Sequence, residues 1–577
     1  MGEGAEALLR RLEAARGSYS GGAGVAKLEL LRELARRRLR TAKAVLRLHE
    51  ILCFLRAYPD DDAVLGQVER MLAAFAHRGD LRRFRSVLTD TGIAGTQIHY
   101  RLFWPMARWV ARRWPEQLQL DWRENGRAEQ ILEVLPLLMP YSEIAGFEEL
   151  DLSPRDWLER LEGPAETDAA FLVRRIEALP GDDFQREALH DRLDLWYRLD
   201  PSSETPSRTR AKYGAAPLVY QTQPLDRSRP DLRQEVHRRP VAVHALRRRE
   251  GQRLLDLARE AMLTRSRDLD VFAFGDPDDV RLVDFGHGLQ FVTIGFLPER
   301  RPLLHAIYGF LTLQNGVPIG YVLASALFRH AEVAYNTFET YRGGEAAQVF
   351  GRVLAMTRYL FGSDSFSIDP YQLGYGNKEG LASGAWWFYY KLGFRPLDPE
   401  VRRVLRGELA AMQANPRHRS SIATLKKLAA EHVFFVPSGR GAGRAQQRSG
   451  RRSLAAGGPG LLPLWNVSLG ITEHLAERFG AERERGLRVC AGEAAHTLGL
   501  RSFRGFSAGE RQAWQRWAPL VTALPEVARW GAADKRALVQ VIRAKGGRRD
   551  SDFVRRFDAH PRLRRAILRL AARAGEA

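Results

Sequence analysis

The sequence contains few cysteines and no long apolar run. Its 577 residues include two cysteines, Cys53 and Cys490, which lie far apart in apolar helical contexts. Such cysteines are typical of buried free thiols in a reducing compartment, and no Cys/His cluster has the spacing of a zinc site. No apolar stretch approaches the roughly 20 residues of a membrane-spanning helix, and the N-terminal residues lack the apolar core of a signal peptide. We therefore expect a cytoplasmic protein without a transmembrane segment and without a metal.

Lysine is also scarce, whereas arginine is abundant. The chain has nine lysines against 80 arginines, 69 acidic residues and a formal net charge of +20. An arginine excess of this kind is typical of a GC-rich bacterial genome, and many of the arginines stand beside acids on helix faces. A solvated basic surface accounts for this pattern. Alternatively, the basic surfaces attract an anionic partner such as RNA, a carrier protein or anionic lipid.

The chain length and the changes of composition along the chain predict several domains. Residues 1–200 have the apolar periodicity of helices, whereas residues 201–239 are rich in Pro, Ser, Thr and Gln and predict an extended linker. Residues 437–460 carry five arginines and no acid, which predicts a second linker. The remaining expected parts are a central domain at 240–398, a helical extension at 399–436 and a C-terminal helical region at 461–577.

The central segment alternates between strand and helix patterns. Asn315-Gly316 lies between two β-rich runs and is the strongest short hairpin signal available. Val317–Phe328 and Glu332–Tyr341 should therefore be neighbouring strands. The expected class is an α+β multidomain protein, in which a mixed, mostly antiparallel central sheet has helices on both sides and is flanked by N- and C-terminal helical regions.

A glycine pair follows the strand that ends near Tyr341. Gly343 and Gly344 stand directly before an amphipathic helix. Free amides at a helix N-terminus favour anions, and glycine lets a phosphate approach the backbone without a Cβ in the way. We expect the amides around Gly343 to Ala347 to face an open groove that accepts a pyrophosphate.

The order of these elements, together with the later stretch YQLGYGNKEGLASGAWWFYYKLGFRP (371–396), resembles the GNAT family of N-acyltransferases. The resemblance covers about 240–398. In that family a turn of the pattern Gln/Arg-x-x-Gly-x-Gly/Ala holds the acyl-coenzyme A pyrophosphate, and Tyr341, Gly344 and Ala346 align with it here. The late family signature Asn-x-x-Ala-x-x-x-Tyr-x-x-x-Gly-Phe is matched at Ala385, Tyr389, Gly393 and Phe394, while Ala382 replaces its Asn.

The resemblance implies an N-acyltransferase that moves an acyl group, acetyl above all, from acyl-coenzyme A to an amine by direct attack. Tyr389 would protonate the leaving thiolate, and Glu339 would act as the general base. Asn377 and Ser383 could orient the amine. The residues that would bind acetyl-CoA or another acyl-CoA are Tyr341, Arg342, Gly343, Gly344, Ala346 and Ala347.

Other interpretations stay open at this point. His287 and His305 are further candidate bases, and His330 is expected in a surface turn. In a second class of function, the central domain is a non-catalytic GNAT-like scaffold whose flanking basic helices bind a protein or RNA partner. In a third, the basic helical parts hold RNA or an anionic carrier while the central domain modifies it.

Overall fold

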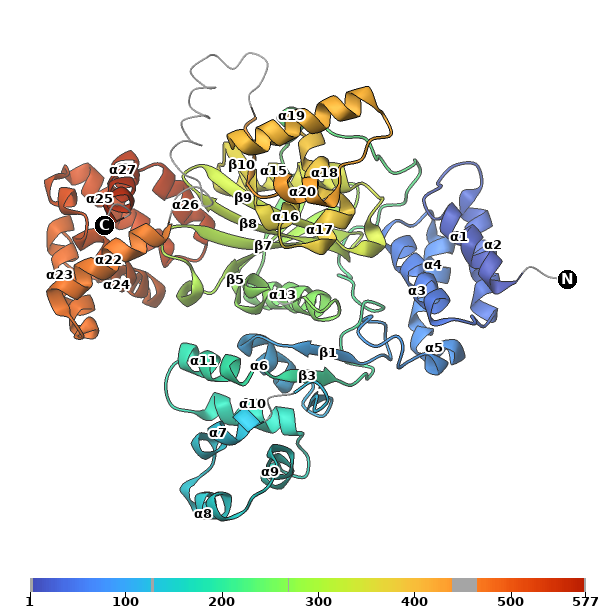
Figure 1. The fold of residues 1–577 in the computed structure, drawn as a ribbon, viewed down its shortest axis with the longest axis horizontal. Helices are drawn as coiled ribbons and strands as arrows, with labels where there is room; N and C mark the ends of the chain where they lie inside the picture. Colours follow the sequence, from blue (N-terminus) through green and yellow to red (C-terminus); the bar gives the residue numbers. More distant parts are fainter. Residues whose placement is uncertain (1–3, 126–128, 268, 438–463, 575–577) are drawn as a thin grey trace. The chain divides into compact units, whose positions relative to one another are not determined.

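The computed structural model describes residues 4–125, 129–267, 269–437 and 464–574 (Figure 1). These residues form two compact units. The first comprises residues 1–225, 252–274 and 313–319, and the second comprises 226–251, 275–312 and 320–577. The segment 437–460 that we expected to be a linker lies, beyond Pro437, outside the described residues.

The first unit is helical at its N-terminal end and also contains a small sheet that the sequence analysis did not predict. Helices α1 (Ala5–Ala15), α2 (Ala23–Arg36), α3 (Ala42–Ala57) and α4 (Asp62–Ala73) are followed by strands β1 (Ile98–Arg101), β2 (Leu118–Leu120) and β3 (Trp196–Leu199). The strands are antiparallel in the order β1-β3-β2. Each has only three or four residues, which is too short for alternation to stand out in a helical region.

The segment expected to be an extended linker is well packed where it follows β3. Thr205, Ser207 and Thr209 are each no more than 4% exposed. Arg56 of α3 donates hydrogen bonds to the carbonyls of Arg208, Thr209 and Ala211. The linker prediction is therefore wrong for this stretch, because buried carbonyls that bind a buried guanidinium hold it in place.

The second unit is built on a sheet of nine strands in the order β11-β12-β10-β9-β8-β7-β6-β5-β4. The pairing of β8 (Val317–Leu327) with β9 (His330–Thr337) is antiparallel, which confirms the expected neighbours. Strand β9 is parallel to β10 (Ser365–Ile368), so the sheet is mixed and mostly antiparallel. The remaining strands are β4 (Ala242–Ala245), β5 (Gly275–Asp284), β6 (Leu289–Phe296), β7 (Ala306–Gln314), β11 (Arg395–Pro396) and β12 (Val433–Phe435).

The hairpin between β7 and β8 turns at the expected residues. Asn315 and Gly316 both have positive φ, 49° and 76°, as a two-residue hairpin turn with left-handed central residues requires. This tip (313–319) belongs to the first unit, where the Asn315 amide donates to the carbonyls of Ala57 and Val219 and accepts from the Val219 N–H.

Strand β12 is a second feature that sequence patterns did not reveal. It lies in the segment expected to be a helical extension, after α19 (Pro399–Ala414) and α20 (Ile422–Leu428). It pairs antiparallel with both β10 and β11 and so fills the sheet between them. Its three residues, Val433–Phe435, have no periodicity of their own, and the strand forms because the open edge of β10 supplies hydrogen-bond partners.

Two helices pack together against the central strands. Helix α15 (Ala346–Phe361) and helix α18 (Ala385–Lys391) lie on the same side of β8–β10 (Figure 1). Phe350 of α15 contacts the rings of Tyr335 on β9 and of Tyr389 on α18. The aromatic face of the late helix therefore belongs to the buried core of this unit.

The C-terminal helices α22–α27 (from Leu464–Phe479 to Pro561–Ala574) share that core. A buried polar cluster joins α26 (Asp550–Asp558) to the sheet. The Asp279 carboxylate accepts from the Tyr308 hydroxyl and from the Asp550 N–H, and the Ser551 N–H donates to the same hydroxyl at 3.0 Å. Burial raises the pKa of Asp279 to about 6, against the opposing charges of Arg281 and Arg301.

Candidate active site

The parallel pair β9–β10 separates partway along its length. Pairing runs from His330 opposite Ser365 to Glu332 opposite Ser367 and then stops. Strand β9 continues to Thr337 and remains paired with β8 on its other side. The backbone of β9 beyond Glu332 therefore has no strand partner on the β10 side. We call this opening the β9–β10 gap.

Three titratable side chains, each on a strand or directly beside one, lie close enough to interact where the pairing ends. Glu332 lies on β9, Asp369 directly follows β10, and His432 directly precedes β12. The Nε2 atom of His432 lies 3.0 Å from Oε2 of Glu332. Both side chains are partly exposed, at 21% and 26%, so the pair is accessible from solvent.

The electrostatics of this group follow from its geometry. Burial alone would lower the pKa of His432, but the hydrogen bond and the charge of Glu332, together with the charge of Asp369, raise it above its usual value. Burial raises the pKa of Asp369, and the neighbouring Glu332 charge adds to that effect, whereas its hydrogen bond from the Gln372 N–H and the His432 charge oppose it. His432 is thus a basic imidazole held by a carboxylate.

His330 lies on the same face and is enclosed instead. Its two ring nitrogens lie 2.8 Å and 2.9 Å from the hydroxyls of Ser365 and Ser367. Burial, with the charge of His432, lowers the pKa of His330 to about 3, so it stays neutral. Our expectation that His330 lies in a surface turn is wrong, because two serine hydroxyls on β10 satisfy the imidazole inside the sheet.

Tyr389 lies with α15 on the side of the sheet that carries Tyr335. It is 3% exposed, and its ring packs edge-on against Phe350, Phe388 and Phe394. Burial raises the pKa of its phenol, and the proximity of Tyr335 and Asp369 raises it further. Among the described residues no side chain or backbone group hydrogen-bonds to its hydroxyl. The phenol therefore keeps its proton and is close enough to Asp369 to feel its charge.

The expected phosphate turn lies between β9 and α15. Gly343 has φ = +90° and open space where a Cβ would stand, so the backbone there is accessible. Ala346 and Ala347 open α15 and are partly exposed, whereas Gly344 is buried. Tyr341 is 2% exposed, so its side chain belongs to the core and is not presented to a ligand.

The charged side chains of this turn are already engaged. Arg342 forms an ion pair with Glu379 and donates to the Thr337 carbonyl at 3.2 Å. The Glu345 carboxylate accepts from the Asp226 N–H at 3.2 Å, and burial raises its pKa, with the Asp226 charge acting in the same direction. A pyrophosphate at this turn would thus meet accessible backbone amides, but it would also lie near acidic side chains, including that of Glu345.

The other residues expected at the site, Glu339, Asn377 and Ser383, lie in a turn or stabilise a helix end. Glu339 was expected late on a strand, but β9 ends at Thr337 and Glu339 is an exposed residue of a 3₁₀ turn, η3 (Glu339–Tyr341). Asn377 caps helix α17 (Lys378–Ser383) by accepting from the Gly380 N–H, and the Ser383 hydroxyl donates to the Gly380 carbonyl. The Asn377 amide also donates to the Tyr371 carbonyl, so these hydrogen bonds of both side chains are local.

Sequence reasoning missed Glu332, Asp369 and His432. His432 and Glu332 are 100 positions apart. One signal was present, since each of these polar residues borders or interrupts a short apolar run that the structure shows to be a strand. The run Val433–Phe435 was too short to be recognised, and without it His432 had no predicted place beside Glu332.

No protein-family model, curated protein or solved structure matches this chain. Within the described ranges, no three or more His, Cys, Asp or Glu side chains are grouped so as to hold a metal ion. In the same part of the chain, no helix combines the length and apolar character needed to cross a membrane.

Proposed function

We propose that the second unit is a GNAT-type N-acyltransferase, which transfers an acyl group, acetyl above all, from acyl-coenzyme A to an amine. The observation that carries the proposal is the β9–β10 gap, which has a basic imidazole–carboxylate pair at its edge. The phenol of Tyr389 is close enough to Asp369 to feel its charge and has no hydrogen-bond partner among the described residues. The turn at Gly343 and Gly344 opens from the end of the same strand, β9. A donor whose pyrophosphate lies at that turn would bring its thioester into the gap.

His432 is the proposed general base and Glu332 its positioning residue. A hydrogen bond from Nε2–H to Glu332 fixes the tautomer and leaves Nδ1 free to accept a proton. Its raised pKa makes the imidazole a stronger base near neutral pH, which is the range in which general-base catalysis works best. This assignment replaces Glu339, which stands exposed outside the strand.

The reaction balances with these groups. The amine nitrogen loses a proton to His432 Nδ1 and attacks the thioester carbonyl carbon. Unpaired amides of β9 beyond Glu332 would stabilise the oxyanion. The C–S bond then breaks, and the thiolate receives a hydrogen bond and then a proton from the Tyr389 hydroxyl. The products are an amide and free coenzyme A, and the proton on His432 returns to Tyr389 through solvent.

A second candidate is a non-catalytic scaffold of the same fold, whose basic helices bind a protein or RNA partner. The side chains of the turn at Gly343 and Gly344 favour this scaffold, because Arg342 is already paired with Glu379 and Glu345 stands where a pyrophosphate would lie. In this case neither the gap nor the turn would bind a donor.

Release of free thiol from acetyl-CoA tests the proposal. The wild type is incubated with acetyl-CoA and a panel of amines that includes amino acids, polyamines and lysyl peptides, and thiol is measured with a chromogenic disulfide. We expect amine-dependent thiol release that His432→Gln lowers by about 10²-fold, the scale of a lost general base. Thiol release that no amine stimulates would favour the scaffold. Amine-dependent release that His432→Gln leaves unchanged would exclude His432 as the base.

A further inference from the structure

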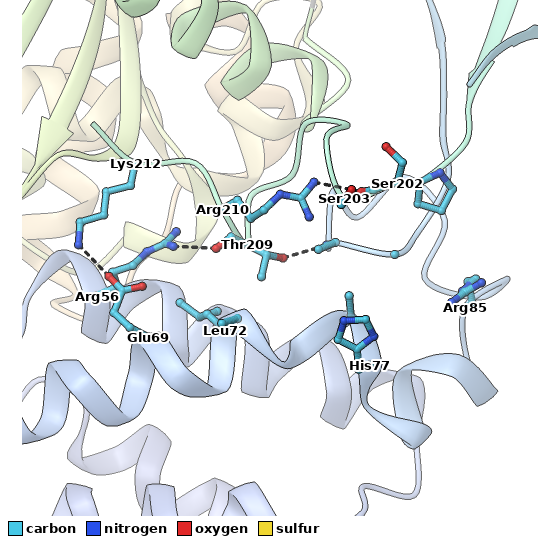
Figure 2. A pocket seen from close by; sticks show the side chains of 15 residues that line it. Arg56, Glu69, Leu72, His77, Arg85, Ser202, Ser203, Thr209, Arg210 and Lys212 are labelled. Atoms are coloured by element: carbon cyan, nitrogen blue, oxygen red, sulfur yellow. Dashed lines mark hydrogen bonds and ion pairs between the residues drawn. The ribbon is translucent and has the colours of Figure 1, made fainter. Parts of the chain in front are cut away.

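The first unit contains a pocket with a volume of about 630 Å³. Its walls come from α3, α4, the 3₁₀ turn η1 (Phe75–His77) and the segment after β3, and Figure 2 shows its side chains. None of the residues discussed for the second unit takes part in it. A pocket of this size is in the range that holds small organic ligands.

The wall of the pocket carries an excess of positive charge. Four cationic side chains, Arg56, Arg85, Arg210 and Lys212, face one carboxylate, Glu69, which leaves an excess of three positive charges. Lys212 Nζ lies 2.7 Å from Glu69 Oε1, so that pair is internally neutral (Figure 2). The remaining charge belongs to the three arginines.

None of these arginines forms an ion pair with an acidic side chain among the described residues. Arg56 is 2% exposed, bonds only to backbone carbonyls, and has an enclosed Nε without a partner there. Arg210 donates to the carbonyl of Ser202 (Figure 2) and to that of Thr205. Arg85 is exposed, and its guanidinium makes no hydrogen bond to any of the described residues. The charges of Glu204 and Glu260 also act on Arg210, without an ion pair among the described residues. Buried or half-enclosed guanidinium groups whose direct contacts are carbonyl dipoles attract an anion.

The rest of the lining is apolar or carries hydroxyls, apart from the imidazole of His77. Leu72, Ala73 and Ala76 form an apolar stretch, and the hydroxyl of Ser203 lies at the opposite wall (Figure 2). Thr209 contributes little, because its Oγ1 already accepts from the Ala94 N–H and meets His49 Nε2 at 2.9 Å. A ligand that suits both surfaces has an anionic group and an apolar or aromatic part.

We propose that this pocket binds a small phosphate ester of about mononucleotide size. The negative charge and several acceptor oxygens of a phosphate ester suit a wall of guanidinium groups without ion pairs, which bind phosphate through directed hydrogen bonds. The organic part lies against Leu72, Ala73 and Ala76. A polyanion such as RNA would also be drawn to positive charge, but it would depend on exposed arginines outside the pocket as well.

Calorimetric titration of ADP into the full chain at low salt tests the proposal, with adenosine and inorganic phosphate as partial probes. We expect saturable binding of one ADP per chain, and at least tenfold weaker binding of each partial probe. Arg85→Gln and Arg210→Gln should each weaken ADP binding by about tenfold, the scale of one lost charge-assisted contact. Ala73→Phe, which adds bulk and no charge, should abolish it.

Arg83→Gln is the matched control, because Arg83 is exposed, lies two positions from Arg85 and does not line the pocket. It should leave the ADP affinity within twofold of the wild type. Thermal midpoints near the wild-type value show that each variant is folded. Absence of saturable ADP binding would overturn the proposal. ADP binding that Gly344→Val weakens and Arg85→Gln does not would also overturn it. So would binding of a single-stranded RNA that Arg83→Gln and Arg85→Gln weaken equally.

Discussion

His432 Nε2 lies 3.0 Å from Glu332 Oε2, and this contact joins the residue before β12 to the middle of β9. The two strands are not neighbours, because β10 lies between them. Their side chains meet only because β10 ends at Ile368 and the pairing of β9 with β10 ends at Glu332. The contact therefore marks the opening in the sheet on which the proposed function depends.

Replacing Glu332 should change the pKa of the proposed base, His432, and leave its imidazole in place. Glu332→Gln removes the charge that raises the pKa of His432, so that pKa should fall. Turnover should drop, and the acid limb of the pH–rate profile should move to lower pH by about one unit, which corresponds to 1.36 kcal/mol. An NMR titration of the His432 ring gives the same pKa directly. The control is Glu431→Gln, an exposed acid next to His432 whose charge raises the same pKa less than Glu332 does, so the limb should move less than in Glu332→Gln.

The phenol of Tyr389 should matter to turnover and not to donor binding. Tyr389→Phe should lower the turnover of acetyl-CoA by about 10²-fold while its affinity and the thermal midpoint stay near the wild-type values. Tyr390 is the matched control, since its ring stacks on Trp386 and lies under the Arg395 guanidinium. If Tyr390→Phe and Tyr389→Phe lower turnover equally, Tyr389 has no role as an acid.

The negative charge of Glu345 at the phosphate turn should weaken donor binding in the wild type. Glu345→Gln removes a negative charge and keeps an acceptor for the Asp226 N–H. We expect coenzyme A to bind about fivefold more tightly, which corresponds to about 1 kcal/mol of relieved repulsion. Glu339→Gln removes an exposed acid of the neighbouring turn and should have less than half that effect in free energy. Equal gains from both variants would indicate a general charge effect and no local pyrophosphate site.

The raised pKa of His432 also predicts how stability varies with pH. A histidine whose folded pKa exceeds its unfolded value of about 6.5 stabilises the fold fully below that pH, and the contribution is lost as the pH rises through the folded pKa. His432→Gln should therefore lower the thermal midpoint more at pH 5.5 than at pH 8.5. An equal difference at both pH values would show that the charge of His432 does not contribute.

Asn315 should be one of the costliest polar side chains to remove from the first unit. It is 2% exposed, and its amide makes three hydrogen bonds to Ala57 and Val219. Asn315→Ala should lower the free energy of unfolding by about 3 kcal/mol, at about 1 kcal/mol per bond. Asn415→Ala, at an exposed position, should change it by less than about 0.5 kcal/mol in the same urea titration. A loss below 1 kcal/mol for Asn315→Ala would contradict this role.

Local patterns predicted the features of the fold that depend on neighbours in sequence. The Asn315-Gly316 turn, the β8–β9 pair and helix α15 were all expected, because turn chemistry and apolar periodicity specify them locally. Strand β12 and the small sheet of the first unit were not expected. Their strands are very short, and they form because distant chain edges offer hydrogen bonds.

The candidate site was harder to predict than the fold for the same reason. Tyr389 could be proposed from a motif within one helix. Glu332 and His432 could not be paired without β12, and burial of Tyr341 could not be read from its place beside a glycine turn. The packing of residues 205–211 was also hidden, because a polar, proline-rich composition is shared by flexible linkers and by segments that a buried arginine holds.

The most direct test of the proposed function is calorimetric titration of acetyl-CoA into the wild type, Gly344→Val and Ala347→Glu. The first variant adds bulk at the turn, and the second adds a negative charge at the partly exposed first turn of α15. The account predicts saturable one-to-one binding to the wild type and at least tenfold weaker binding, about 1.4 kcal/mol, to each folded variant. Absence of binding to the wild type, or equal affinity in all three proteins, would contradict it.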